Sequence, residues 1–149
     1  MRTQKMSIEQ VPNHSDDLQK PILSHLVVCD SVAQGPDGKA TLYGLFNRIV
    51  VEKVPTAHSD MTLFMTFAYG RAGKYSIRFE ISAPSKKIAL NSPPINFELQ
   101  DDKAVHNVNI RFQGFPLPEE GPYRIAIFFG KEEFPIEDKL LFFVEKKGS

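Results

Sequence analysis

Apolar and polar residues alternate with a period of two along much of this chain, and the pattern predicts β-strands. The clearest runs are residues 74–82, 95–100 and 107–113. Successive side chains on a strand point to opposite faces of a sheet, so each run has one buried face and one wet face. Helical spacing would instead bring Arg78 or Asn109 into the core. The alternation therefore favours strands over helices.

A second set of runs is more continuously apolar. Such runs are typical of central strands, or of strands whose second face is also covered. They occupy residues 22–31, 61–69, 123–129 and 140–144. Gly44 interrupts a further run at 40–49 and predicts a bulge there.

Glycines and prolines separate these runs. Residues 35–38 and 70–73 predict turns, and residues 129–132 predict a two-residue hairpin with glycine first. The prolines at 91–94 and 115–118 predict loops, because proline offers no donor to a ladder. No ten-residue helical stripe interrupts this order. We therefore predict an all-β fold: a two-sheet antiparallel β-sandwich, immunoglobulin-like or C2-like, with about eight strands.

The domain organisation follows from where the pattern begins. Residues 1–20 are mostly polar and without period, so we predict a disordered N-terminal arm. Residues 21–147 are predicted to form one β-sandwich domain. The chain has 149 residues, of which 42% are apolar, and this suits a single domain with one core.

Charge and composition narrow the classes of partner. Lysine and arginine total 18, as do aspartate and glutamate, so the net charge is zero. Binding to a phosphate backbone usually requires a basic excess, so we predict no nucleic-acid partner. No run approaches the ~20 apolar residues of a membrane helix, and the N-terminus lacks the apolar core of a signal peptide. We predict a soluble, cytoplasmic protein with no membrane partner.

Cys29 is the single cysteine, so the chain can form no internal disulfide, which fits a reducing compartment. A cysteine nucleophile needs a base within hydrogen-bond reach. His25 lies four residues away on the same predicted strand, about 13 Å along it at ~3.3 Å per residue. Free cysteine is among the most buried residue types, so we interpret Cys29 as structural. A Cys29-dependent enzyme is kept only as an alternative.

Other catalytic and metal signatures are missing from the sequence. The four histidines are scattered, and no Cys-x-x-Cys or His-x-x-x-His spacing occurs. The carboxylates concentrate at predicted turns, where solvated side chains explain them. We predict no enzyme activity, no metal and no cofactor.

Four basic residues are the first candidates for a binding site: Arg71, Lys74, Lys86 and Lys87. Arg71 and Lys74 flank one predicted hairpin loop, and the two lysines occupy another. If both loops lie at the same end of the sandwich, they form a patch that attracts anions. The alternative is that they are charged loop tips that favour solubility.

Phe115 and Leu117 are the second candidates, in a predicted proline-rich loop at 113–122. Apolar residues on a loop have no strand face to occupy, so they could anchor a partner protein. The alternative is that they close one end of the core.

Asp30 and Arg48 are interpreted as structural residues. We expect the Asp30 carboxylate to accept hydrogen bonds from backbone N–H groups of the turn, and Arg48 to lie on the surface or to pair locally.

Three stretches carry a family resemblance: LVVCDSV at 26–32, ATLYGLFNRI at 40–49 and EEGPYRIAIFFGKEEF at 119–134. Their shared pattern is Cys-Asp on an early strand, Gly-Leu-Phe-Asn-Arg-Ile on the next, and Gly-x-Tyr opening a late strand. The chain resembles an uncharacterised bacterial family of small single-domain β-sandwich proteins of unknown function. The resemblance implies a fold and no activity.

The function itself is unknown from the sequence. Our leading hypothesis is a non-catalytic protein-interaction or structural module, and the alternative is a β-sandwich that binds a small ligand. The partner would be another protein or a second copy of the chain, because an open sandwich has edge strands that can pair. Pro135 near the last predicted strand would block one such edge.

Overall fold

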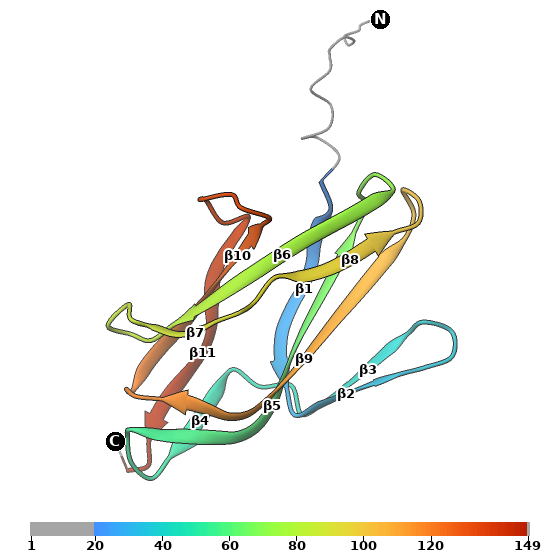
Figure 1. Ribbon diagram of the computed structural model, residues 1–149. Helices are drawn as coiled ribbons and strands as arrows, with labels where there is room; N and C mark the ends of the chain where they lie inside the picture. The colour runs from blue at the N-terminus through green and yellow to red at the C-terminus, as the bar shows by residue number, and fades with distance from the viewer. Residues whose placement is uncertain (1–19, 149) are drawn as a thin grey trace, which may run out of the picture.

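A computed structural model describes residues 20–148, and within them the chain is all β (Figure 1). Because these residues contain no helix, none of their elements is a membrane-spanning helix. Most of the predicted N-terminal arm, residues 1–19, lies outside the described residues. The strands are β1 (Ile22–Cys29), β2 (Ser31–Gln34), β3 (Ala40–Tyr43), β4 (Arg48–Val51), β5 (Thr56–Ala68), β6 (Gly73–Ser82), β7 (Ile88–Asn91), β8 (Ile95–Leu99), β9 (Val105–Leu117), β10 (Gly121–Phe129) and β11 (Glu137–Lys146).

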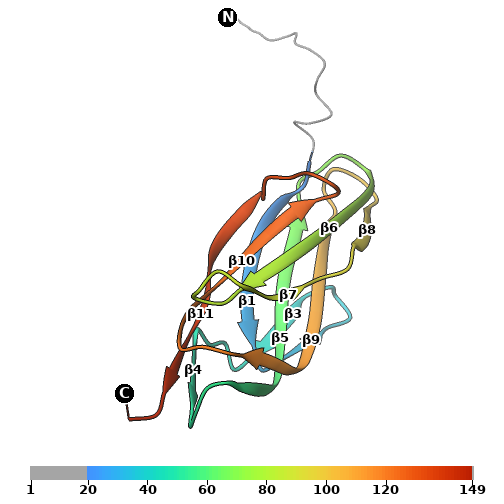
Figure 2. The same cartoon turned by 60° about the vertical axis from the view of Figure 1, so that its left-hand side comes forward.

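Two sheets face each other across one core, as Figures 1 and 2 show. The smaller sheet has three antiparallel strands in the order β1-β5-β9. The larger has six strands, in the order β4-β11-β10-β6-β7, with β8 also paired to β6. β2 and β3 form a separate two-stranded hairpin.

The prediction of an all-β fold is confirmed, but two of its details are wrong. The described residues contain eleven strands, where about eight were expected from typical sandwiches. The larger sheet is mixed, because β4 pairs with β11 in parallel. The parallel pairing and one of the added strands arise where the predicted strand at 40–49 breaks, and β2 and β7 are further short strands. β3 ends at Tyr43 and β4 begins at Arg48, because the chain leaves the β2–β3 hairpin and enters the larger sheet between them.

The core follows the predicted alternation. In β6, Ile77, Phe79 and Ile81 are buried while the residues between them are not. β5 is buried on both faces, as its continuous apolar run predicts: Met65 is 0% exposed on the inner face, and Phe64 is 6% exposed on the outer face. The inner face packs against the larger sheet, and the β2–β3 hairpin lies over part of the outer face.

The predicted loop at 113–122 is wrong. β9 continues to Leu117 and pairs with the start of β5, with Pro116 opposite Ala57 and Leu117 opposite Thr56. Proline is tolerated here because β9 is an edge strand, on which one row of backbone donors is not needed by a ladder. The predicted two-residue hairpin at 129–132 is also wrong, because a loop at 130–136 separates β10 from β11.

Tyr123 fixes the connection between β9 and β10. Its hydroxyl donates to the Glu119 carbonyl at 2.8 Å and accepts from the Glu119 backbone N–H at 3.1 Å. The ring is fully buried and stacks on Phe142, with centroids 5.1 Å apart. Burial raises the pKa of Tyr123, so the hydroxyl remains a donor throughout the physiological range. We call this arrangement, in which a tyrosine near the start of a strand bonds to backbone a few residues upstream, the tyrosine corner.

We predict that Tyr123→Phe lowers the free energy of unfolding by about 1 to 3 kcal/mol, because it removes both hydrogen bonds and leaves part-buried backbone groups of Glu119 unpaired. Urea unfolding of the two proteins measures the difference. Tyr69→Phe is the matched control, because Tyr69 is 76% exposed and its replacement should change little. Equal stability of Tyr123→Phe and the unsubstituted protein would contradict this role.

Candidate functional site

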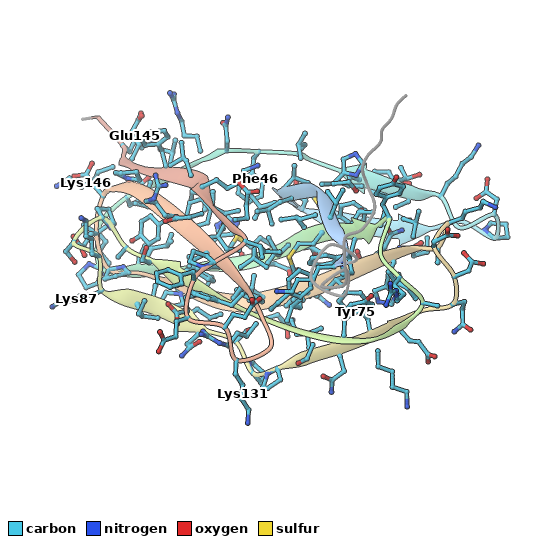
Figure 3. All side chains as sticks on the ribbon, turned by 90° about the horizontal axis from the view of Figure 1, so that it is seen from above. Phe46, Tyr75, Lys87, Lys131, Glu145 and Lys146 are labelled. Carbon is cyan, nitrogen blue, oxygen red and sulfur yellow. The ribbon has the colours of Figure 1, made fainter. Side chains whose placement is uncertain are left out.

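The structure does not bring the four predicted basic residues together. Arg71 and Lys74 lie at the start of β6, whereas Lys86 and Lys87 follow its end, and β6 itself is ten residues long. A strand of that length separates them by about 30 Å. Figure 1 shows the two loops at opposite ends of β6, and in Figure 3 Lys87 lies far from Tyr75, the neighbour of Lys74. The condition for an anion patch, that both loops lie at the same end of the sandwich, is therefore not met.

Phe115 and Leu117 are not surface anchors. They are 1% and 0% exposed, because β9 extends through them and points both side chains inward. The Phe115 ring packs edge-on against Phe112 and Phe142, with centroids 5.3 and 6.0 Å apart. The alternative interpretation, that these residues close one end of the core, is the correct one.

Cys29 is buried, as predicted for a structural cysteine. Its thiol donates to the carbonyl oxygens of Ser31 and Thr62, at 3.4 and 3.8 Å. Burial raises the pKa of the thiol, and the adjacent Asp30 carboxylate raises it further. The thiol is therefore protonated near neutral pH and poorly suited to act as a nucleophile. Within residues 20–148, no group of three His, Cys, Asp or Glu side chains is placed to hold a metal ion.

The segment that joins the two sheets carries a more promising candidate site. We call residues 43–48 the crossing segment. On one side, the backbone N–H of Phe46 donates to the carbonyl of Val28 at 3.2 Å, which attaches the segment to the edge of β1. On the other side, the N–H of Phe143 in β11 donates to the carbonyl of Asn47 at 2.9 Å. The crossing segment thus connects the edges of both sheets.

Gly44 and Asp30 determine the path of the crossing segment. The backbone N–H of Asp30 donates to the carbonyl of Tyr43 at 2.9 Å, and Gly44 then turns the chain with a φ of 65°. A Cβ at Gly44 would overlap the Asp30 carboxylate. Glycine is therefore required both by the left-handed backbone and by the close approach of Asp30. The predicted bulge at Gly44 is instead a change of sheet.

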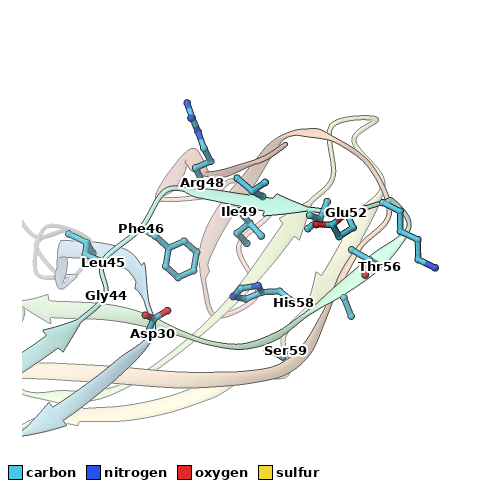
Figure 4. Close-up of a pocket in the computed structure, with 14 residues that line it drawn as sticks. Asp30, Gly44, Leu45, Phe46, Arg48, Ile49, Glu52, Thr56, His58 and Ser59 are labelled. Carbon is cyan, nitrogen blue, oxygen red and sulfur yellow. The ribbon is translucent and has the colours of Figure 1, made fainter. Parts of the chain in front are cut away.

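The predictions for Asp30 and Arg48 have different outcomes. Asp30 uses its backbone N–H to hold the crossing segment, while its carboxylate packs beside Gly44, as Figure 4 shows. The expectation that this carboxylate accepts from turn donors is not met by any hydrogen bond of the described residues. Arg48 lies on the surface, as expected, at 3.8 Å from the Glu145 carboxylate on the neighbouring strand.

A pocket of about 650 Å³ opens between the crossing segment, β4 and the start of β5 (Figure 4). We call it the crossover pocket. Phe46 and His58 face each other from its two sides, with ring centroids 5.8 Å apart and planes tilted by 55°. Asp30 lies at one end and Glu52 at the other. The pocket thus offers an apolar ring, an imidazole and carboxylates to a ligand or to a side chain of a partner.

Two smaller hollows adjoin the crossing segment. One, of about 330 Å³, lies between β1 and β11, where the Lys139 ammonium approaches the Leu26 carbonyl at 3.5 Å. We call it the seam. The other, of about 470 Å³, lies between the β2–β3 hairpin and the outer face of the smaller sheet, and we call it the hairpin groove. Leu45 is 62% exposed and lines all three hollows.

Sequence reasoning did not single out Leu45, Phe46 or His58 as binding residues. Leu45 and Phe46 belong to the Gly-Leu-Phe-Asn-Arg-Ile stretch that carried the family resemblance. The available signal was Gly44, since a glycine inside an apolar run marks a place where the strand cannot continue regularly. His58 gave no signal, because only the fold brings the start of β5 opposite Phe46.

We predict that Gly44→Ala destabilises the protein by about 1 to 2 kcal/mol from the left-handed backbone, with an added cost from displacing Asp30. In an Asp30→Ala background the added cost should largely disappear, so Gly44→Ala should cost less there. Urea unfolding of the two single variants and the double variant measures this coupling. Equal costs of Gly44→Ala in both backgrounds would show that Asp30 does not press on this position.

Comparison with known proteins places most of this chain in a family. A search of curated proteins finds no match. A family model described as a family of unknown function (DUF6941) matches residues 24–135. The matched region contains Asp30, the crossing segment and Tyr123, and it covers most of the 149 residues. The resemblance to an uncharacterised family is thereby confirmed, and the chain belongs to the family of unknown function DUF6941.

Proposed function

We propose that this protein is a non-catalytic interaction module built on an immunoglobulin-like sandwich. The strand pairing supports this assignment. β5 pairs with β9, and β10 lies between β6 and β11, which are the pairings of strands B with E and of F with C and G in immunoglobulin domains. The tyrosine corner of Tyr123 opens β10, the strand that corresponds to F.

The observation that carries the proposal is the position of Leu45. An exposed leucine that lines three hollows gives a protein partner both an apolar contact and recesses for its own side chains. Tyr43, 54% exposed, precedes it on the same segment. Binding energy at protein interfaces concentrates in a few such apolar and aromatic residues.

The charges around Leu45 have both signs. Asp30 and Glu52 line the crossover pocket together with Arg48 and Lys53, and Lys139 lines the seam. A partner surface of mixed charge around an apolar centre fits this arrangement better than a uniformly charged polymer does. The proposed partner is therefore a folded protein or an extended segment of one, and the contact requires no chemical step.

We predict that Leu45→Asp abolishes capture of this partner while changing the free energy of unfolding by less than about 0.5 kcal/mol, because the side chain is already exposed. Affinity capture of the tagged chain from an extract of its source, quantified by mass spectrometry, makes the measurement. Ile88→Asp is the control, because Ile88 is 52% exposed on β7, in the other sheet. A partner retained equally by both variants would place the binding surface elsewhere.

We also propose that the protein acts in the cytoplasm. Cys29 is the single cysteine of the chain and is buried as a free thiol. A domain of this size without disulfides fits a compartment in which thiols stay reduced.

A second candidate function is binding of a small ligand in the crossover pocket. Its volume of about 650 Å³ lies within the range of ~300 to 1,000 Å³ of small-molecule sites. The facing rings of Phe46 and His58 would hold the apolar part of such a ligand, and Asp30 would accept hydrogen bonds from its polar part.

We predict that a ligand at 100 times its Kd raises the melting temperature by roughly 5 to 10 °C, because binding to the folded state alone stabilises it by about 2.7 kcal/mol. A thermal-shift screen measures this, and His58→Gln should reduce the shift. His25→Gln is the control, since His25 does not line this pocket. A shift that survives His58→Gln undiminished would argue against binding beside this ring.

A further inference from the structure

One edge of the smaller sheet is long, regular and unpaired. β9 pairs with β5 and has no other strand partner among residues 20–148. From Val105 to Gln113 it runs opposite Ala68 to Asp60 without a break in register. The other side of these nine residues therefore presents a straight row of backbone donors and acceptors that no neighbouring strand of the described chain uses.

Other edges of the two sheets are short or blocked. The edge of β1 is occupied at Val28 by the Phe46 N–H and at Leu26 by the Lys139 ammonium. β4 and β7 have four residues each and β8 has five, and prolines 93 and 94 separate β7 from β8. Short strands, lysines and prolines are the usual devices that prevent pairing between sheet edges. Between Val105 and Gln113, β9 has no lysine, no proline and no bulge.

The outer face of β9 is also free of repulsive charge. Its side chains there include Asn107, Asn109 and Gln113, which are neutral. Arg111 donates two hydrogen bonds to Asp60, at 2.9 and 2.8 Å. These bonds lower the pKa of Asp60 and raise that of Arg111, so both groups stay charged and compensate each other.

We propose that β9 is a homodimerisation edge, at which the β9 strands of two copies pair antiparallel about a two-fold axis through Asn109. This axis lies at the centre of the nine regular residues, so it gives them their fullest overlap. It places Asn107 opposite Arg111 of the second copy, Val108 opposite Ile110, and Asn109 opposite itself. No like charges face each other in this register, and two three-stranded sheets become one continuous six-stranded sheet.

A second copy suits this edge better than an unrelated peptide because the strand is complementary to itself. The β2–β3 hairpin strengthens the argument. It crosses the outer face of the smaller sheet, and its tip projects beyond β9 in both Figure 1 and Figure 2. A copy placed along β9 therefore meets the hairpin as well as the strand edge. Exposed Val105, which lines the hairpin groove, would then be covered.

Sedimentation velocity of the full chain tests the proposal. We expect a concentration-dependent dimer for the unsubstituted protein and a monomer for Asn109→Lys, which places two ammonium groups against each other at the axis. Asn109→Gln is the matched control and should remain dimeric, and circular dichroism should show both variants folded. A monomeric unsubstituted protein, or a folded Asn109→Lys that remains dimeric, would overturn the proposal. If β9 paired only with a different protein, the purified chain would sediment as a monomer, and this result too would overturn the proposal.

Cross-linking tests the register. Directly opposed residues of an antiparallel pair have Cα atoms about 4.5 to 5.5 Å apart, within the range of about 4.4 to 6.8 Å that a disulfide spans, so Asn109→Cys should give a disulfide-linked dimer under mild oxidation. Gln113→Cys should not, because this register places it opposite Val105; Cys29 is buried in both variants. Cross-linking through Gln113→Cys instead of Asn109→Cys would overturn the two-fold axis at Asn109.

The Leu45→Asp variant separates this proposal from the proposed function. It should lose the partner protein and remain dimeric, so loss of the partner and loss of the dimer are distinguishable.

Discussion

The contact between Gly44 and Asp30 is the constraint on which the arrangement of the two sheets depends. At Gly44 the chain leaves the β2–β3 hairpin, turns with a left-handed backbone, and reaches the larger sheet four residues later at Arg48. The Asp30 N–H holds the start of this path, and β11 receives its end. Because the crossing segment is bonded at both ends, it closes one side of the core and sets β4 parallel to β11.

The same crossing creates the irregular surface that we consider functional. Regular sheets present smooth faces, whereas a chain that changes sheets leaves gaps on either side of it. The crossover pocket, the seam and the hairpin groove all border this segment, and Leu45 lies between them. Binding residues held on a connection by a rigid scaffold are the common arrangement in sandwiches, since the scaffold preorganises them at low entropic cost.

The crossing segment also makes the edges of the smaller sheet unequal. It occupies the edge of β1, while nothing comparable lies along β9 in residues 20–148. Closing one edge and leaving the other open gives residues 20–148 a long unpaired strand edge, at which we propose association. The candidate partner site at Leu45 and the proposed dimer edge at β9 are therefore consequences of the same asymmetry, and the β2–β3 hairpin lies between them.

The sequence by itself determined the all-β fold and much of the core, because side-chain alternation is a local property of a strand. Ile77, Phe79 and Ile81 are buried as their spacing predicts, and the buried Cys29 follows from its chemistry. Only the tertiary structure decided where the strands end and which residues come into contact. Phe115 and Leu117 lie in the core because β9 continues to pair with β5 past Pro116. The four basic residues lie apart because β6 separates the two pairs. The crossover pocket joins Asp30, Phe46 and His58, whose proximity depends on long-range pairing that no local pattern encodes.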